Sequence, residues 1–489
     1  MVFSSPIFIF LFLPVVILVY YFINVQFRNL LLLIASLFFY AWGEPKVVFL
    51  MIFSILLNYS FGILIEHYNK RLKISRIIVA IAIISNLSFL IYYKYINFIL
   101  DNFNNLLIGF EAQPIVIDKV SLPIGISFFT FHVISYIIDA YKGKTPIQKN
   151  PLLLGLYVSF FPQLVAGPIV RYHDIAEQLT KRTVDLNGIA YGTQRFVLGL
   201  GKKVLISNPL AQVADQIFSS NTNELTSPIA WLGIICYTLQ LYFDFSGYSD
   251  MAIGLGRIFG FKFLENFNYP YISKSIQEFW RRWHISLSTW FRDYLYIPLG
   301  GNRVKKSRFY FNLLIVWLAT GIWHGASWNF IIWGLFHGLF IIIERVPAIK
   351  KVLGALWSPF QHIYALLIVI IGWVFFRAED LNYAIEYLRS MFMLQTPEVV
   401  SQYASMYLNN EVYLALLFGI VGSTPIIKSY SKLYDLTILK LNSNNNKTFK
   451  YTLGYLMHAV KLIGLVLIFI FTIASLASNT YNPFIYFRF

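Results

Sequence analysis

The sequence predicts an all-α integral membrane protein built as a polytopic helical bundle, and three observations lead to this fold class. Hydrophobic residues make up 57% of the chain and charged residues only 13%, whereas a soluble domain carries about a quarter charged residues. Apolar runs of roughly 20 residues recur, each long enough to cross about 30 Å of hydrocarbon as a helix. The sequence does not show the alternation of apolar and polar residues that is typical of a β-barrel. We therefore expect about 11 to 13 spanning or re-entrant segments.

The expected segments follow one another along the whole chain. Some, including 30–42, 152–166 and the two on either side of residue 324, are too short to cross alone. We expect tilted, re-entrant or broken helices there, because protein or a water-filled cavity must cover the freed backbone groups. Residues 1–24 lack a basic start and a clear cleavage site, which favours a retained first span over a removed signal peptide. The segments are 3–23, 30–42, 47–65, 77–93, 124–141, 152–166, 189–206, 229–245, 309–323, 330–343, 352–376, 412–427 and 453–476.

Lysine and arginine are concentrated in particular loops, and this distribution predicts the orientation of the chain in the membrane. The connections 70–76, 142–149 and 428–450 are basic, and the last contains the Asn-rich stretch 442–447, a predicted flexible linker. Because cytoplasmic loops carry an excess of positive residues, we expect these three in the cytoplasm. Counting spans leaves the direction of the middle segments open. The formal net charge of +16 fits this bias and contact with a lipid bilayer better than it fits nucleic-acid binding, which we do not expect.

We expect a single membrane domain over residues 1–489, because the sequence contains no internal repeat and no separate soluble domain. Within it we assign residues 1–120 to N-terminal helices, 121–345 to a catalytic core and 346–489 to C-terminal helices. The single cysteine, Cys236, excludes an intrachain disulfide and argues against a cysteine-based metal site. We predict no metal site and no permanently bound cofactor.

A histidine at membrane depth is the main candidate for chemistry. His324 lies between Gly321 and Gly325, with apolar sequence on both sides, and an ionisable group at that depth is costly and usually functional. The glycines would let a substrate or another helix approach closely. Neutral imidazole, with a reference pKa of about 6.5, can take a proton from a hydroxyl nucleophile. The alternative is a packing histidine that is hydrogen-bonded and has no chemical role.

A second stretch, 273–294, mixes aromatic residues with charge at helical spacing. This pattern is typical of an interfacial helix or of a helix bordering a wet cavity, and we expect it to face the cytoplasm. Its cations Arg281, Arg282 and Arg292 have two interpretations: they anchor lipid headgroups, or they bind the phosphates of an acyl-coenzyme A donor. His284 is an interfacial histidine or a reactive one, because histidine titrates near neutral pH in either role.

Two carboxylates lie among aromatic and small residues near or within the membrane. Asp244 and Asp250 need partners at that depth, and we expect Arg257 or the basic 273–294 stretch to supply them. Structural pairing is favoured over direct chemistry for both.

These stretches together resemble the membrane-bound O-acyltransferase family, and within it the bacterial branch of alginate and peptidoglycan O-acetyltransferases. The resemblance extends over most of the chain and is highly specific in combination. It rests on Ser127-Phe128-Phe129-Thr130-Phe131-His132, Phe161-Pro162-Gln163-Leu164-Val165-Ala166-Gly167-Pro168-Ile169, Phe243-Asp244-Phe245-Ser246-Gly247-Tyr248-Ser249-Asp250, Phe279-Trp280-Arg281-Arg282-Trp283-His284-Ile285-Ser286-Leu287-Ser288, Trp323-His324-Gly325-Ala326 and Trp373-Val374-Phe375-Phe376-Arg377-Ala378.

The resemblance implies a ring of helices around a central tunnel in the bacterial inner membrane. It implies that His324 matches the family's essential histidine and that His284 occupies the second functional position, which is Asn in many relatives. It further implies acetyl-coenzyme A as donor, a polysaccharide acceptor outside the cytoplasm and an exported SGNH-type O-acetyltransferase as partner. We expect Trp323 and Ser327, with Arg281, Arg282, Arg292 and Asp244, to bind the donor or line the tunnel.

Our hypothesis is that His324 is the base for acyl transfer and that His284 orients the thioester or the acceptor. Two other functions remain open from the residues. Buried His and Asp could form the proton path of a transporter or flippase, although no inverted repeat is visible. A non-catalytic scaffold for a cell-envelope polymer complex is the third. The sequence does not identify the acceptor.

Overall fold

The structure is a computed structural model, and it describes residues 1–165, 167–394, 403–426, 447–478 and 481–483, without the side chains of 447–454. All regular elements in these residues are helices, which confirms the predicted all-α class. The predicted linker 442–447 lies outside the described residues except for Lys447, the first residue of the last helix. The division of the chain at residues 120 and 345 stays a prediction.

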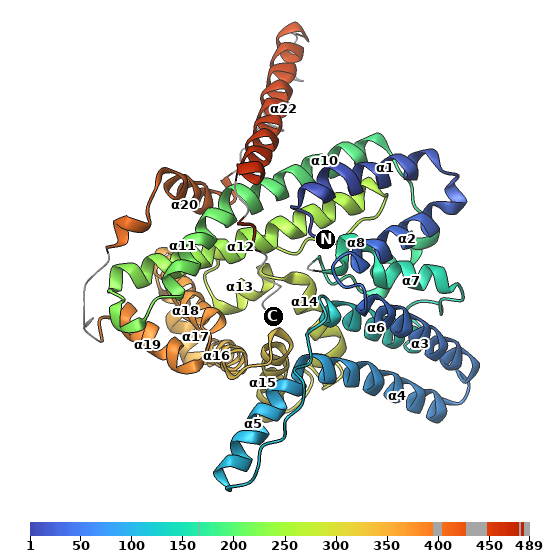
Figure 1. Cartoon of the computed structure of the whole chain (residues 1–489), viewed down its shortest axis with the longest axis horizontal. Coiled ribbons are helices and arrows are strands. Elements are labelled where there is room, and N and C mark those ends of the chain that lie inside the picture. The colour runs from blue at the N-terminus through green and yellow to red at the C-terminus, as the bar shows by residue number, and fades with distance from the viewer. Residues whose placement is uncertain (166, 395–402, 427–446, 479–480, 484–489) are drawn as a thin grey trace.

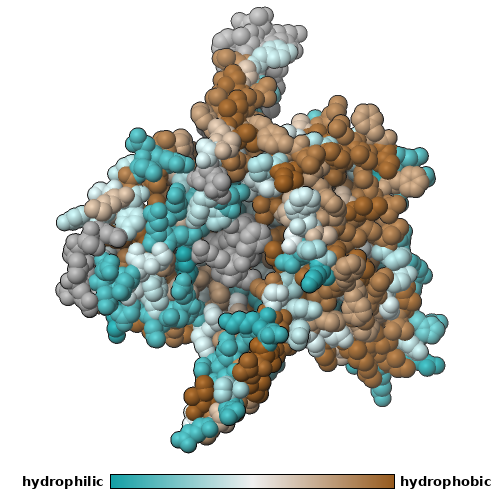
Figure 2. Space-filling model, in the orientation of Figure 1, coloured by the Kyte–Doolittle hydropathy of each residue, from teal (hydrophilic) through white to brown (hydrophobic). Residues whose placement is uncertain are grey.

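The N-terminal helices form one side of the molecule (Figure 1). Apolar side chains cover much of the surface over them (Figure 2). Helix α4, a π-helical turn η3 and helix α5 join into a single apolar run of 38 residues, Leu72–Gly109, which is longer than the predicted 77–93. The elements are η1 Phe8–Phe12, α1 Leu13–Phe22, η2 Val25–Phe27, α2 Arg28–Ala41, α3 Val47–His67, α4 Leu72–Leu90, η3 Ile91–Tyr95 and α5 Ile96–Gly109.

The middle of the chain surrounds α12, a helix of 32 residues that is buried along almost its whole length. Helix α10 packs lengthwise against α12 (Figure 1). The elements are α6 Ile126–Tyr141, α7 Pro151–Ser159, α8 Phe161–Leu164, α9 Tyr172–Thr180, α10 Leu186–Gly201, η4 Lys202–Ser207, α11 Asn208–Phe218, η5 Thr222–Glu224, α12 Ser227–Ile258, η6 Pro270–Ile272, α13 Ile276–Arg282, α14 Ile285–Phe291 and η7 Arg292–Tyr296.

Next in the chain come the helix that ends at His324 and the helix after it, and the C-terminal helices follow. Helix α5 and the last helix, α22, project from the body on opposite sides (Figure 1). The elements are α15 Lys306–His324, α16 Trp328–Ile343, α17 Pro347–Ala355, α18 Ser358–Arg377, α19 Leu381–Met391, η8 Ala404–Tyr407, α20 Asn410–Gly422 and α22 Lys447–Ser478.

Several helices are long and apolar enough to cross a membrane. Five described helices meet this condition, or six if α16 and α17, which meet at 83°, form one broken span. Shorter apolar helices include α6 and α20. The protein is therefore a multi-pass membrane protein. Among the segments expected to be tilted, re-entrant or broken, 152–166 is split between α7 and α8.

Glycines let α10 and α12 approach closely. A Cβ on Gly192 would lie 2.5 Å from the Gly254 carbonyl oxygen, and a Cβ on Gly199 would lie 2.5 Å from that of Gly247. No real Cβ tolerates such distances, so these positions require glycine. Contact through small residues is the usual way for apolar helices to gain packing energy where the hydrophobic effect is weak.

The buried carboxylates of α12 are paired, as predicted, but with other partners. Lys203 Nζ lies 2.8 Å from Asp244 Oδ1, and Asp250 binds Lys202 and Arg195, each at 2.7 Å. The prediction of Arg257 or the basic stretch was wrong. The reason is that α10 and η4 pack along α12 and bring their cations to the same face.

The structure also divides two further stretches that were each predicted as one segment. The stretch 273–294 is not one interfacial helix: it breaks between α13 and α14 at Trp283 and His284, and its tryptophans are buried. The predicted span 352–376 begins too early, because α17 ends at Ala355 and a separate helix starts at Ser358.

Candidate functional site

His324 is the last residue of α15, and its side chain is enclosed by aromatic rings. The residue is 6% exposed. Its ring centroid lies 4.9 Å from those of Trp323 and Trp333 and 5.2 Å from that of Phe376. Within the described part of the chain, its Nδ1 has no hydrogen-bond partner. The expected alternative, a packing histidine held by hydrogen bonds, finds no support at this atom.

The two glycines near His324, Gly321 and Gly325, each allow a different close contact with α16. A Cβ on Gly321 would lie 2.3 Å from the Phe330 carbonyl oxygen and 3.2 Å from Gly334 Cα, so Gly321 lets α16 approach α15. A Cβ on Gly325 would lie 2.2 Å from the Phe330 ring. The close approach predicted from these glycines is thus an approach of another helix. It fixes the position of the turn that follows His324.

His284 connects α13 to α14 in a strained backbone conformation. Its φ of 44° and ψ of 54° lie in the left-handed region, which a residue other than glycine adopts at some cost, often at functional sites. Asn266 Oδ1 accepts from the backbone N–H of Ser286 at 3.1 Å and lies 3.3 Å from His284 Nδ1. Because that atom must be an oxygen to accept from Ser286, neutral His284 donates from Nδ1 and presents Nε2 as an acceptor. Nε2 is buried and has no partner among the described residues.

Trp323 stands beside both histidines. Its ring centroid lies 4.9 Å from that of His324 and 6.2 Å from that of His284, and it stacks on Phe131. A void of about 10 Å³ borders His324 and is otherwise lined by apolar side chains: Leu241, Phe245, Trp283, Trp333, Trp373 and Phe376. Phe245 also contacts His284, with ring centroids 4.6 Å apart. The tertiary structure therefore brings together the two histidines that are 40 positions apart in sequence.

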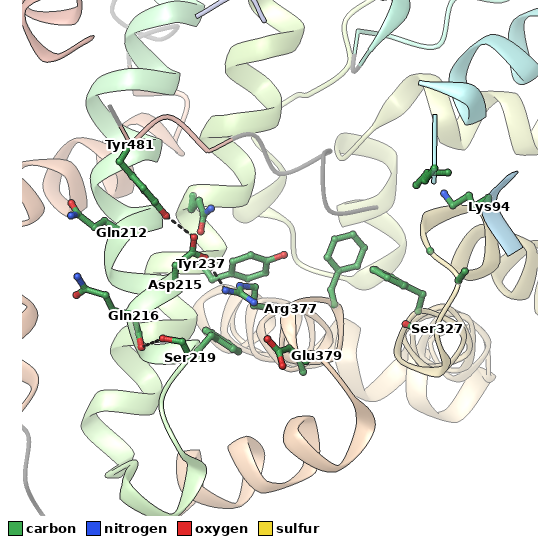
Figure 3. Close-up of a pocket in the computed structure, with 18 residues that line it drawn as sticks. Lys94, Gln212, Asp215, Gln216, Ser219, Tyr237, Ser327, Arg377, Glu379 and Tyr481 are labelled. Carbon is green, nitrogen blue, oxygen red and sulfur yellow. Dashed lines mark hydrogen bonds and ion pairs between the residues drawn. The ribbon is translucent and has the colours of Figure 1, made fainter. Parts of the chain in front are cut away.

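A cavity of about 910 Å³ reaches the turn after His324 (Figure 3). Lys94 and Ser327 lie on one side of it, and an ion-paired group formed by Asp215 and Arg377 lies on the other (Figure 3). Tyr481 donates a hydrogen bond to Asp215 at 2.5 Å. Amides, aromatic rings, a second carboxylate and small or apolar residues complete the lining. The residues are Lys94, Leu122, Gln212, Asp215, Gln216, Phe218, Ser219, Tyr237, Gln240, Gly325, Ala326, Ser327, Phe330, Phe376, Arg377, Ala378, Glu379 and Tyr481.

The three predicted donor-binding arginines lie elsewhere. Arg282 donates to Glu278 at 2.8 Å, Arg292 donates to Asp293 at 2.8 Å, and Arg281 is exposed. None of them lines the 910 Å³ cavity as the described residues define it. Of the other predicted residues, Trp323 contacts both imidazoles and Ser327 lines the cavity, whereas Asp244 is held by Lys203.

The sequence prediction did not include Lys94, although this residue touches the site. Lys94 lies in η3 and is 8% exposed; its Nζ donates to the carbonyl oxygens of Trp323 at 2.6 Å and His324 at 3.2 Å. The available signal was a lysine within an apolar run, since such residues are rare at membrane depth. The predicted segment 77–93 ended just before it. His337, fully buried against Trp280 and Trp333, was also missed.

Comparisons with known proteins find a matching family and several relatives. Residues 123–374 match the model of the membrane-bound O-acyltransferase family. A probable alginate O-acetylase of Azotobacter vinelandii is 41% identical over the full length of both chains. The peptidoglycan O-acetyltransferase of Helicobacter pylori is 38% identical over 91% of this chain and 90% of its own. The teichoic acid D-alanyltransferase of Bacillus subtilis is 33% identical over 44% of this chain and 57% of its own.

The family match contains α6, both histidines and the whole of α15 and α16, and the full-length relatives extend the similarity to both ends. The chain is thus an O-acyltransferase and belongs to the membrane-bound O-acyltransferase family.

Proposed function

We propose that this protein takes an acetyl group from acetyl-coenzyme A on the cytoplasmic side of the bacterial inner membrane and delivers it through a tunnel for O-acetylation of a cell-envelope polysaccharide. An exported SGNH-type O-acetyltransferase completes the transfer. The observation that carries the proposal is His324, a buried imidazole that borders the aromatic void and directly precedes the turn that lines the 910 Å³ cavity. The alginate and peptidoglycan O-acetyltransferases among the relatives support the choice of acyl group and acceptor class.

In the proposed reaction His324 acts as general base. It takes the proton of the accepting hydroxyl, whose oxygen then attacks the thioester carbonyl carbon. The tetrahedral intermediate collapses as the carbon–sulfur bond breaks, and the proton passes from His324 to the leaving thiolate. A base in this role must be neutral before the reaction, and the aromatic enclosure by Trp323, Trp333 and Phe376 favours the uncharged imidazole.

His284 is proposed to orient a reactant. Its donor atom Nδ1 faces Asn266, so the buried Nε2 can accept a hydrogen bond from a hydroxyl or from an amide of the donor's pantetheine arm. The left-handed backbone holds this imidazole at a defined angle. This geometry suits positioning better than it suits a second base, because positioning requires one acceptor in a rigid place.

The orientation of α6 and α15 supports placing the 910 Å³ cavity on the extracytoplasmic side. Leu122, just before α6, lines the cavity, and α6 leads away from it to Lys142 and Lys144. Helix α15 begins next to Lys305 and ends at the cavity. Because cytoplasmic loops carry an excess of lysine and arginine, we place both basic ends in the cytoplasm and the cavity on the other side. Its amides, carboxylates and aromatic rings suit a sugar or the active-site loop of the partner enzyme.

The test uses purified protein in lipid vesicles with acetyl-coenzyme A, candidate oligosaccharide acceptors and the partner enzyme. We expect thioester consumption by the wild type and its loss in His324→Ala and His284→Ala at unchanged protein yield. His67→Ala is the matched control, because His67 lies at the end of α3 away from the cavity and should keep full activity. Unchanged turnover in His324→Ala would refute the assignment of the base.

A further inference from the structure

The turn that carries His324 is held by a lysine from a distant helix. Lys94 Nζ donates to three acceptors: the carbonyl oxygens of Trp323 at 2.6 Å and His324 at 3.2 Å, and Ser127 Oγ at 3.3 Å. An ammonium has three donor hydrogens, so these three contacts use all of them. Lys94 therefore has no donor left for a substrate, and its role concerns the protein itself.

The contacted carbonyls are those that a helix end leaves without partners. The last four carbonyls of an α-helix have no intrahelical donor, and together they carry about half a negative charge. Lys94 meets this charge at the C-terminal end of α15 (Lys306–His324). Its neighbour Tyr95 donates to the carbonyl oxygen of Ile322 at 2.6 Å. Two consecutive side chains thus bind three consecutive carbonyls that end at His324.

A π-helical turn makes this contact possible. Lys94 and Tyr95 end η3, the π-helical turn between α4 and α5. An inserted π turn rotates the residues that follow it, and such turns occur frequently at functional sites. The ammonium pairs with no carboxylate within 4.0 Å among the described residues, so the end of α15 is its principal counter-charge. A buried lysine in that contact indicates a function, because its desolvation is costly.

We propose that Lys94 is a positioning residue for His324. Its ammonium anchors the last turn of α15 to α6 and to the α4–α5 helix, and this sets the backbone from which the imidazole projects. The inference rests on the proposed function, since it assumes that His324 takes part in turnover. It predicts that loss of the ammonium disturbs catalysis more than substrate binding, because a reacting group displaced by about 1 Å loses about 100-fold in rate.

The experiment measures steady-state acetyl-coenzyme A consumption in vesicles for Lys94→Met, Lys94→Gln and Lys94→Arg, with His324→Ala in parallel. Lys94→Met keeps most of the length of the side chain and removes the charge. We expect kcat to fall about 100-fold while KM for acetyl-coenzyme A changes less than threefold. Lys94→Arg should recover at least tenfold of the loss. Lys73→Met, at an exposed lysine of the same helix, should match the wild type.

Hydrogen exchange provides a second readout that needs no activity. We expect faster amide exchange in Lys94→Met confined to residues 321–327, and exchange near the wild-type rate in Lys94→Arg. Where Lys94→Met does not yield folded protein, Lys94→Gln replaces it, since an amide can still donate to one carbonyl.

The outcomes separate the two proposals. If His324→Ala is inactive but Lys94→Met keeps kcat within threefold, the positioning role is wrong and the proposed function stands. Equal loss in Lys94→Met and Lys94→Arg, with unchanged exchange at 321–327, would also overturn it. If His324→Ala is active, the proposed function itself fails, whatever the Lys94 variants do.

Discussion

Gly334→Ala would insert a methyl group between the two helices that form the His324 turn. The added Cβ would lie 2.4 Å from the Trp317 carbonyl oxygen and 3.0 Å from Gly321 Cα. Both atoms belong to the backbone of α15, so no side chain can rotate away. Ordinary contact begins at about 3.4 Å, and the helices must therefore separate by about 1 Å, the displacement that costs about 100-fold in rate. Gly334 itself lines neither the void beside His324 nor the 910 Å³ cavity.

We expect kcat for thioester consumption to fall about 100-fold in Gly334→Ala, with a loss of about 1–3 kcal/mol in stability from overpacking. The assay is turnover in vesicles alongside thermal unfolding of the purified protein. Gly464→Ala in α22 is the control, because nothing lies within 4 Å of the added Cβ and alanine favours the helix. Wild-type kcat in Gly334→Ala would show that the spacing of α15 and α16 does not set the site.

Three further predictions concern other parts of the molecule. His284→Asn should fold as well as the wild type, since Asn tolerates the left-handed backbone better, and should keep more activity than His284→Ala; equal activities would exclude the acceptor role of the side chain. Lys203→Met should cost about 3–5 kcal/mol in thermal unfolding, because it removes the cation from the buried Asp244 pair, and a loss below 1 kcal/mol would show that the pair is dispensable. Burial alone would raise the pKa of Asp293, but the hydrogen bond from Arg292 and the charges of Arg292 and Arg171 lower it below its usual value. Its contribution to stability is thus present above about pH 3.9 and is lost as the pH falls through the lowered pKa. In Asp293→Asn the unfolding temperature should therefore fall less steeply as the pH is lowered below that range. An unchanged pH dependence of the unfolding temperature would contradict the pairing.

The membrane class and most helices could be predicted because they follow from local composition. An apolar run has to form a helix in lipid, where each backbone group needs an internal partner. That argument located α3, α15 and α16 to within a few residues. It failed for 273–294, where aromatic and charged residues at helical spacing suggested one helix. The break between α13 and α14 depends on the burial of the tryptophans and on the left-handed backbone of His284. Neither feature is visible in a periodic sequence pattern.

Partner choice depended on packing between distant segments. The sequence indicated that Asp244 and Asp250 need cations, since a buried carboxylate is costly. It could not indicate which cations, because many lysines and arginines were available. The glycine contacts between α10 and α12 bring Lys203, Lys202 and Arg195 to the acidic face.

The sequence by itself determined the all-helical membrane class, the family resemblance and the two histidines as candidates, because hydrophobicity and short motifs are properties of neighbouring residues. Only the tertiary structure decided that Trp323 stands beside both His324 and His284, that the arginines of 273–294 lie away from the large cavity, and that Lys94 holds the end of α15. These relations join residues up to 230 positions apart. They depend on how helices pack against one another, and a local sequence pattern contains no information about contacts between residues so far apart in the chain.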